Sequence, residues 1–124
     1  MNEVPFTQNC ERIYAEINLD ALRNNMECIK NRLDGKTGII AVVKTDAYGH
    51  GALPIAREIE NLDGLSGFAV ATDEEAFFLR RKGIRKPVLV LGYVFPGSYE
   101  QMIEDEIRIT VFRDDTLKEL SAVS

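Results

Sequence analysis

Residues 67–92 read GFAVATDEEAFFLRRKGIRKPVLVLG, which is two apolar segments separated by a charged stretch of helical length. Both segments, Gly67–Ala71 and Val88–Leu91, are apolar at consecutive positions, which is typical of parallel strands buried on both faces. Between them, Thr72 and Glu75 have the spacing of a helix capping box, and basic residues followed by a glycine mark the helix end. The stretch therefore predicts a parallel βαβ unit with a right-handed crossover.

The same alternation of strand and helix extends in both directions along the chain. After an opening strand, the pattern indicates four βα units whose strands begin near residues 39, 67, 88 and 107. The other elements expected are a strand at 12–19, a helix capped by Asp20 and reaching about Leu33, a strand at 38–44, a helix from Pro54 to about Leu62, a short helix after a Ser98–Gln101 capping box, a strand at 107–112 and a last helix from Asp114 or Asp115.

Two folds share this rhythm, an open doubly wound sheet and a (β/α)8 barrel. A barrel takes about 250 residues and eight units, whereas this chain has 124 residues and four such units. Length alone therefore favours the small open sheet. In both folds the chemistry lies at the carboxyl ends of the parallel strands, so the residues that follow the strands are the candidates for a site.

The composition indicates a folded domain and excludes several classes of partner. Apolar residues make up 45% of the chain and charged residues 28%, a balance that can fill a core. The net charge of −5 does not supply the positive surface that binding to nucleic acid needs. No apolar run approaches the roughly 18–20 residues of a membrane helix. The N-terminus lacks a secretory pattern, and Cys10 and Cys28 lack metal-ligand spacing, so we expect reduced thiols in a cytoplasmic protein.

A second stretch, Ile39–Gly51 with the sequence IIAVVKTDAYGHG, has a lysine at the end of an apolar strand. Strands often end in a charged residue that reaches water, and position alone does not distinguish that role of Lys44 from a chemical one. An amine partly desolvated by strand ends could instead attack an aldehyde and form a Schiff base, with the hydroxyl of Tyr48 nearby. The Gly-His-Gly segment lacks the spacing of a phosphate loop, and we expect His50 to be a structural hydrogen-bonding residue.

The segment AVVKTDAYGHG resembles the cofactor-lysine motif of the alanine racemase family, which usually reads AVVKADAYGHG, and differs from it only at Thr45. The segments AEINLDALRNN, GFAVATDEEAFFLRRKGIRKPVLVLG and ITVFRDDTLKEL are also similar to the family, so the resemblance covers nearly the whole chain. The family fold is a (β/α)8 TIM barrel followed by a β domain, which overrides the argument from length. The pattern of the sequence itself indicates that residues 1–11 are a loose lead-in. The resemblance implies that residues 12–124 are the N-terminal half of the α/β barrel, with about four parallel βα units plus an N-terminal strand.

The resemblance also implies a chemistry, the racemisation of an amino acid with pyridoxal 5′-phosphate. Lys44 would form the Schiff base with this cofactor and act as the base on one face of the substrate α-carbon. Tyr48 would help hold the phosphate end, and Val42 and Leu91 would line the cofactor ring. The family takes its opposite-face base, a tyrosine, and its pyridine-nitrogen arginine from parts outside these 124 residues, so we expect this chain alone to be inactive.

The implied function is that of the N-terminal portion of an alanine racemase, an isomerase that interconverts L- and D-alanine for cell-wall synthesis. Two alternatives stay open: a serine racemase of the vancomycin-resistance type, which shares the motif, and a non-catalytic module that binds the cofactor or assembles. Half of a barrel has unpaired strand edges and an uncovered inner face, so we expect a homo-oligomer formed through exposed barrel edges. No metal is expected.

Overall fold

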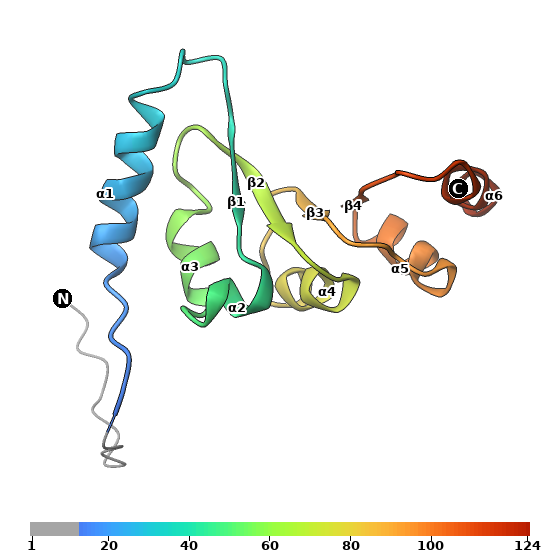
Figure 1. Cartoon of the computed structure of the whole chain (residues 1–124), viewed down its shortest axis with the longest axis horizontal. Coiled ribbons are helices and arrows are strands. Elements are labelled where there is room, and N and C mark those ends of the chain that lie inside the picture. Colours follow the sequence, from blue (N-terminus) through green and yellow to red (C-terminus); the bar gives the residue numbers. More distant parts are fainter. Residues whose placement is uncertain (1–12) are drawn as a thin grey trace.

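The computed structural model describes residues 13–124, which form one parallel β-sheet with helices between its strands (Figure 1). The strands are β1 (Ile39–Val42), β2 (Leu65–Val70), β3 (Val88–Val90) and β4 (Ile107–Ile109), and their order in the sheet is their order in the chain. Each strand pairs in parallel with the next. A doubly wound sheet reverses its strand order at a switch point, whereas a barrel wall does not. The observed order is therefore that of a barrel wall, and the prediction of four parallel βα units is confirmed.

The helices are α1 (Leu19–Lys30), α2 (Lys44–Tyr48), α3 (Ala52–Ile59), α4 (Asp73–Arg81), α5 (Tyr99–Glu104) and α6 (Asp114–Val123), with a 3-10 turn, η1 (Pro96–Ser98), before α5. None of the helices in the described part of the chain has the length and apolar character that crossing a membrane requires.

The helices cover one face of the sheet and leave the other open. Phe68 and Val70 of β2 and Val90 of β3 pack in the helix-covered core and are at most 1% exposed. On the opposite face of β1, Ile40 is 51% exposed and Val42 is 42% exposed. The sheet is therefore built from strands that are apolar on both faces, but the chain covers only one of them. This is the arrangement of half a barrel, whose inner face needs a second set of strands.

The helix between β2 and β3 begins and ends where local signals place it. Thr72 accepts a hydrogen bond from the Glu75 amide at 3.3 Å, which completes the predicted capping box. At the other end of α4, the Arg80 guanidinium donates to the carbonyl oxygens of Ile84 and Asp105, each at 2.8 Å. One side chain thus ties the loops that precede β3 and β4 to the same helix and satisfies carbonyl groups that have no strand partner.

The predicted strand at 12–19 is wrong over the residues that the structure describes. The chain has no regular structure from residue 13 to Asn18, where α1 is about to begin. A strand needs a neighbour to accept its hydrogen bonds, and the sheet of residues 13–124 begins only with β1. Arg12 and the lead-in of residues 1–11 lie outside the described residues.

Two of the predicted helix caps are also wrong. The cap of α1 is Asn18, whose side chain accepts from the Ala21 amide at 2.9 Å, and Asp20 lies inside the first turn. Ser98 makes no side-chain capping bond to α5, and its hydroxyl donates to the carboxylate of Asp73 at the start of α4. In the first case the helix begins earlier than predicted, and in the second the side chain is oriented toward another helix.

Several elements are shorter than predicted at their C-terminal ends. The strand expected at 38–44 ends at Val42, because the chain turns at Lys44, and the strand expected at 107–112 ends at Ile109. The first helix ends at Lys30 and not at Leu33. Such differences arise where tertiary contacts decide the boundary.

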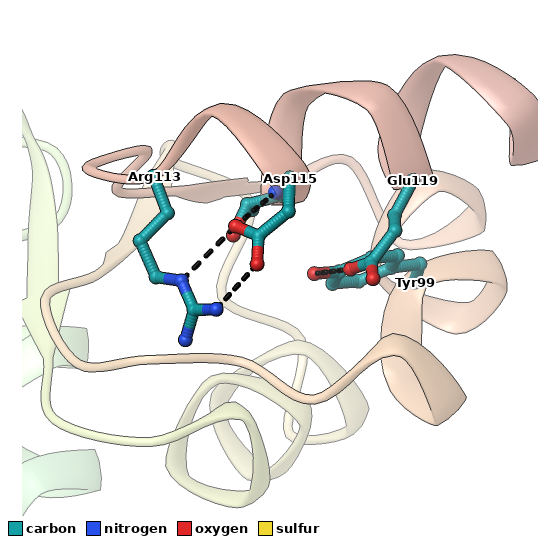
Figure 2. A network of polar contacts seen from close by, with 5 residues as sticks. Tyr99, Arg113, Asp115 and Glu119 are labelled. Atoms are coloured by element: carbon teal, nitrogen blue, oxygen red, sulfur yellow. Dashed lines mark hydrogen bonds and ion pairs between the residues drawn. The ribbon is translucent and has the colours of Figure 1, made fainter.

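Polar contacts stabilise the start of the last helix and join that helix to α5 (Figure 2). Arg113 pairs with Asp115, whose Oδ1 also accepts from the Thr116 amide at 2.9 Å. One turn further along α6, Oε2 of Glu119 lies 3.4 Å from the hydroxyl of Tyr99. Tyr99 is fully buried, and this burial, together with the negative charge of Glu119, raises the pKa of its phenol above the ordinary value of 10.0.

We expect Tyr99 to make folding sensitive to alkaline pH. The phenol of the unfolded chain titrates near pH 10, whereas the folded one stays neutral there, so its contribution is fully present below about pH 10 and is lost as the pH rises through the higher folded pKa. Urea unfolding between about pH 8 and pH 11 should show a falling free energy of unfolding in the wild type and a shallower fall in Tyr99→Phe. Equal slopes in the two proteins would contradict the raised pKa.

Candidate functional site at the carboxyl ends of the strands

The carboxyl ends of β1, β2 and β3 lie side by side at the edge where the sequence predicts a site. Just past β1, the amide of Val43 donates to the carbonyl of Ala69 at 2.8 Å, and past β3 the amide of Gly92 donates to the carbonyl of Ala71 at 3.1 Å. These bonds fix the segments that leave β1 and β3 relative to β2. The residues that follow these strands therefore share one mouth, which we call the sheet mouth.

Lys44 is the first residue of α2 and follows Val42 by two positions. Val43, between them, packs in the core and is 2% exposed, whereas Val42 on the open face is 42% exposed. The Lys44 side chain is half-buried, and its amine takes part in no hydrogen bond or ion pair within residues 13–124. An amine placed in this way can react with an aldehyde.

The segment after Lys44 has an unusual backbone. Thr45, Asp46, Ala47 and Tyr48 have φ angles of 54°, 51°, 52° and 58°, all in the left-handed region. Each non-glycine residue in a left-handed helix costs roughly 1–2 kcal/mol, so a run of four persists only where surrounding contacts hold it. We call Thr45–Tyr48 the left-handed turn.

Hydrogen bonds within the local segment hold part of the left-handed turn. The Asp46 carboxylate accepts from the amide of Ala52 at 2.8 Å, and the Asp46 carbonyl accepts from the amide of Gly51 at 2.9 Å. Gly51 has φ of 88°, which glycine adopts without strain and which lets the chain enter α3. Nδ1 of His50 lies 2.9 Å from the Ala47 carbonyl, which confirms the structural role expected for this histidine.

A carboxylate from α4 completes this support. Glu75 accepts a hydrogen bond from the Thr45 amide through Oε1 at 2.6 Å and one from the Ala71 amide through Oε2 at 2.7 Å. It therefore bridges the residue next to Lys44 and the end of β2. Sequence reasoning missed this role, although the capping box identifies the same glutamate. The capping-box pattern does not indicate that Oε1 of Glu75 also reaches the Thr45 amide, just past the end of β1.

The other sequence-predicted site residues lie around the sheet mouth with accessible side chains. Val42 and Leu91 are each 42% exposed, and Tyr48 is 62% exposed. The hydroxyl of Tyr48 makes no hydrogen bond within the described part of the chain, so none joins it to Lys44 here. On the open face, the small residue Ala69 pairs with Val42 and Leu89 and is itself 1% exposed. The exposed apolar surface at the sheet mouth therefore comes from the side chains of Val42 and Leu91.

A cavity of about 330 Å³ borders the left-handed turn, and its lining includes Asp46 and Glu75 together with Val43, Val70 and Leu79. The last three residues belong to the helix-covered core, so the cavity lies on the opposite side of the sheet from Val42. Lys44 is not among the residues that line it, so the cavity is not a candidate for the chemistry of this amine.

Comparison with known proteins decides the family. Residues 17–124 match the family model described as "Alanine racemase, N-terminal domain". The chain belongs to the alanine racemase family. It is 42% identical over 114 residues to the alanine racemase of Desulforamulus reducens, a match that covers 92% of this chain and 30% of that protein. It is 49% identical over 110 residues to the alanine racemase of Clostridium perfringens, covering 88% of this chain and 28% of that protein.

The solved structures agree with the alanine racemase assignment. The alanine racemase of Clostridium difficile matches with a TM-score of 0.82 and 38% sequence identity, over 90% of this chain and 30% of that one. The resemblance predicted from the AVVKTDAYGHG motif is thereby confirmed, as is the fold, the N-terminal half of an alanine racemase barrel. The chain spans less than a third of the length of these alanine racemases.

Proposed function

We propose that this chain is the N-terminal, lysine-bearing portion of a pyridoxal phosphate-dependent alanine racemase, in which residues 12–124 form an incomplete barrel domain. The observation that carries the proposal is the amine of Lys44, which has no polar partner within residues 13–124, follows β1 and adjoins the left-handed turn. Backbone strain concentrates at functional sites, and barrels of this kind bind their ligands at the carboxyl ends of their strands. As an isomerase, the complete protein would supply D-alanine for peptidoglycan.

The residues at the sheet mouth fit a flat, phosphate-bearing cofactor, pyridoxal 5′-phosphate. Lys44 would hold its aldehyde covalently, Val42 and Leu91 would contact its ring, and the Tyr48 hydroxyl would meet its phosphate. When bound, the cofactor supplies an electron sink for the carbanion at the substrate α-carbon. Support for this fit comes from the exposed apolar side chains on either side of Ala69 and from an amine that has no competing partner within residues 13–124.

Lys44 would then have two tasks, because it binds the cofactor and moves a proton. Its Nζ would take the α-proton from one face of the substrate. Racemisation also requires a proton to be delivered to the opposite face, which a single amine does not do efficiently. We infer that the second acid–base group comes from outside this chain, and we therefore expect little turnover from the chain alone.

Alanine is the proposed substrate, since the matched relatives carry the alanine racemase name. A serine racemase of the vancomycin-resistance type and a non-catalytic cofactor-binding module are the alternatives, and no feature of the sheet mouth favours either. We place the protein in the cytoplasm, because Cys28 is exposed and forms no disulfide within residues 13–124, which suits a reducing compartment.

Reductive labelling should identify Lys44 as the residue that holds the cofactor. Pyridoxal 5′-phosphate is incubated with the chain, the adduct is reduced with borohydride, and peptides are examined by mass spectrometry. The label should lie on Lys44, and Lys44→Ala should lose most of it, because this amine has no competing partner among the residues that the structure describes. Lys118→Ala removes an exposed lysine of α6 and should label like the wild type. Equal labelling of Lys44→Ala and wild type would contradict the proposal.

We also propose that the chain forms a homo-oligomer through the open face and the edges of its sheet. Within the described residues, β1 and β4 each pair on one side only, and unpaired strand edges recruit other strands. Ile40 of the edge strand β1 is 51% exposed and adds an apolar side chain on the open face. A second copy offers an equivalent face and equivalent edges, so two half-barrels can cover one another.

Charge placed on the open face should weaken this assembly. Light scattering should give a mass above the 13.9 kDa of one chain for the wild type, and Ile40→Glu should shift the mass toward 13.9 kDa. The reason is that a carboxylate at this position would have to be buried without a partner. Leu117→Glu places the same charge on an exposed position of α6 and should leave the mass unchanged. A monomeric wild type at micromolar concentration would overturn the proposal.

A further inference from the structure

We propose that Glu75 is a positioning residue for Lys44: its carboxylate joins the left-handed turn to the end of β2 and thereby fixes where the lysine amine lies. This inference rests on the proposed function, because it matters only if Lys44 is the reacting group. Glu75 lies in α4, far from Lys44 in the sequence, and the proposal gives it no contact with the substrate or the cofactor.

The hydrogen bonds of Glu75 differ from those that a capping residue needs. In a capping box the carboxylate bonds to the amide of the cap residue. Here the Thr72 amide is the most distant of the three donors, at 3.4 Å, whereas the amides of Thr45 and Ala71 lie at 2.6 and 2.7 Å. The two short bonds go to the segments that leave two neighbouring strands. The carboxylate is therefore placed to join those strand ends.

The Thr45 amide has a particular need for this acceptor. It lies in the first turn of α2, where amides have no acceptor within the helix. It also begins the run of positive φ angles, so a bond at this point opposes the return of the backbone to an ordinary conformation. Because Thr45 is bonded to Lys44 by one peptide unit, any rotation of this amide also moves the lysine α-carbon.

The local bonds of the left-handed turn do not replace this contact. Asp46 binds the amides of Ala52 and Gly51 and so ties the end of the turn to the start of α3. The Thr45 end is linked to the rest of the sheet by Glu75 and by the Val43 bond to Ala69. The side chain at position 45 is not involved, so the change from the family's alanine to threonine leaves this bond intact.

The chain offers a matched pair of variants to test the proposal. Glu75→Gln keeps the size of the side chain but replaces one acceptor oxygen with a donor, so it can no longer accept from both amides. Glu74→Gln removes the same charge from the neighbouring, exposed position of α4. Thr72→Ala removes the capping hydroxyl without touching the Thr45 bond, and it reports any effect that comes only from a weakened start of α4.

Two measurements on the full 124-residue chain read out the position of Lys44. The first is hydrogen–deuterium exchange of the Thr45 amide without cofactor. The second is the rate of reductive labelling of Lys44 by pyridoxal 5′-phosphate. Glu75→Gln should remain folded by circular dichroism, exchange at Thr45 about tenfold faster and label at Lys44 about tenfold more slowly, the size expected for losing one charge-assisted hydrogen bond. Glu74→Gln and Thr72→Ala should behave like the wild type in both measurements.

The proposal is overturned if folded Glu75→Gln matches the wild type in Thr45 exchange and Lys44 labelling, or if Thr72→Ala reproduces its effects. Should Glu75→Gln fail to fold, Glu75→Asp takes its place, because its shorter side chain cannot span both amides and the same two changes are expected. Absence of Lys44 labelling in the wild type would instead contradict the proposed function. In that case the Thr45 exchange still decides whether Glu75 holds the turn.

Discussion

Four consecutive non-glycine residues in the left-handed region, Thr45–Tyr48, are the constraint around which the sheet mouth is organised. Such a run is unfavourable by itself, so its geometry has to be imposed by the surroundings. Three contacts hold this geometry: the bond from Glu75 of α4, the bond from the Asp46 carboxylate, and the bond between Val43 and β2. The result is that the backbone stops being a strand at Val42 and presents Lys44 at the strand end.

The half-barrel supplies the rigid frame for this turn. Its core lies on one side of the sheet, where fully buried side chains such as Phe68 and Val90 pack against the helices. At the amino ends of the strands, Arg80 ties two loops to α4. The same helix supplies Glu75 at the opposite end of the sheet, so α4 connects the packing of the core to the geometry of the mouth. The open face carries the exposed apolar side chains of Val42 and Leu91, which the proposed cofactor would contact.

Local sequence signals predicted much of this fold. The Thr72–Glu75 capping box, the apolar strands on either side of it and the lysine after Val43 could all be recognised, because each depends on residues close in sequence. The strand expected before α1 was wrong, since a strand exists only with a partner, and no neighbouring strand for it lies within residues 13–124. The bond between Ser98 and Asp73 likewise depended on two segments that meet only in the folded chain.

The candidate site was predictable in its residues but not in its geometry. A lysine at a strand end and a following Gly-His-Gly segment mark the place, and the family motif names the chemistry. The sequence of the turn does not indicate four positive φ angles, because Asp46 adopts them more readily than most residues, whereas threonine, alanine and tyrosine ordinarily avoid them. The left-handed turn depends on tertiary contacts. One of them is the bond between Glu75 and the Thr45 amide, which joins residues thirty positions apart.

The backbone of Thr45–Tyr48 in solution is the most direct test of this account. Nuclear magnetic resonance reports the sign of φ, because a positive φ brings the amide hydrogen close to the α-hydrogen of the same residue. The account predicts strong intraresidue cross-peaks between these hydrogens at all four residues, in contrast to the helices α3 and α4. Weak cross-peaks of ordinary helical strength at Thr45–Tyr48 would mean that the turn is right-handed, and the proposed placement of the Lys44 amine would then be wrong.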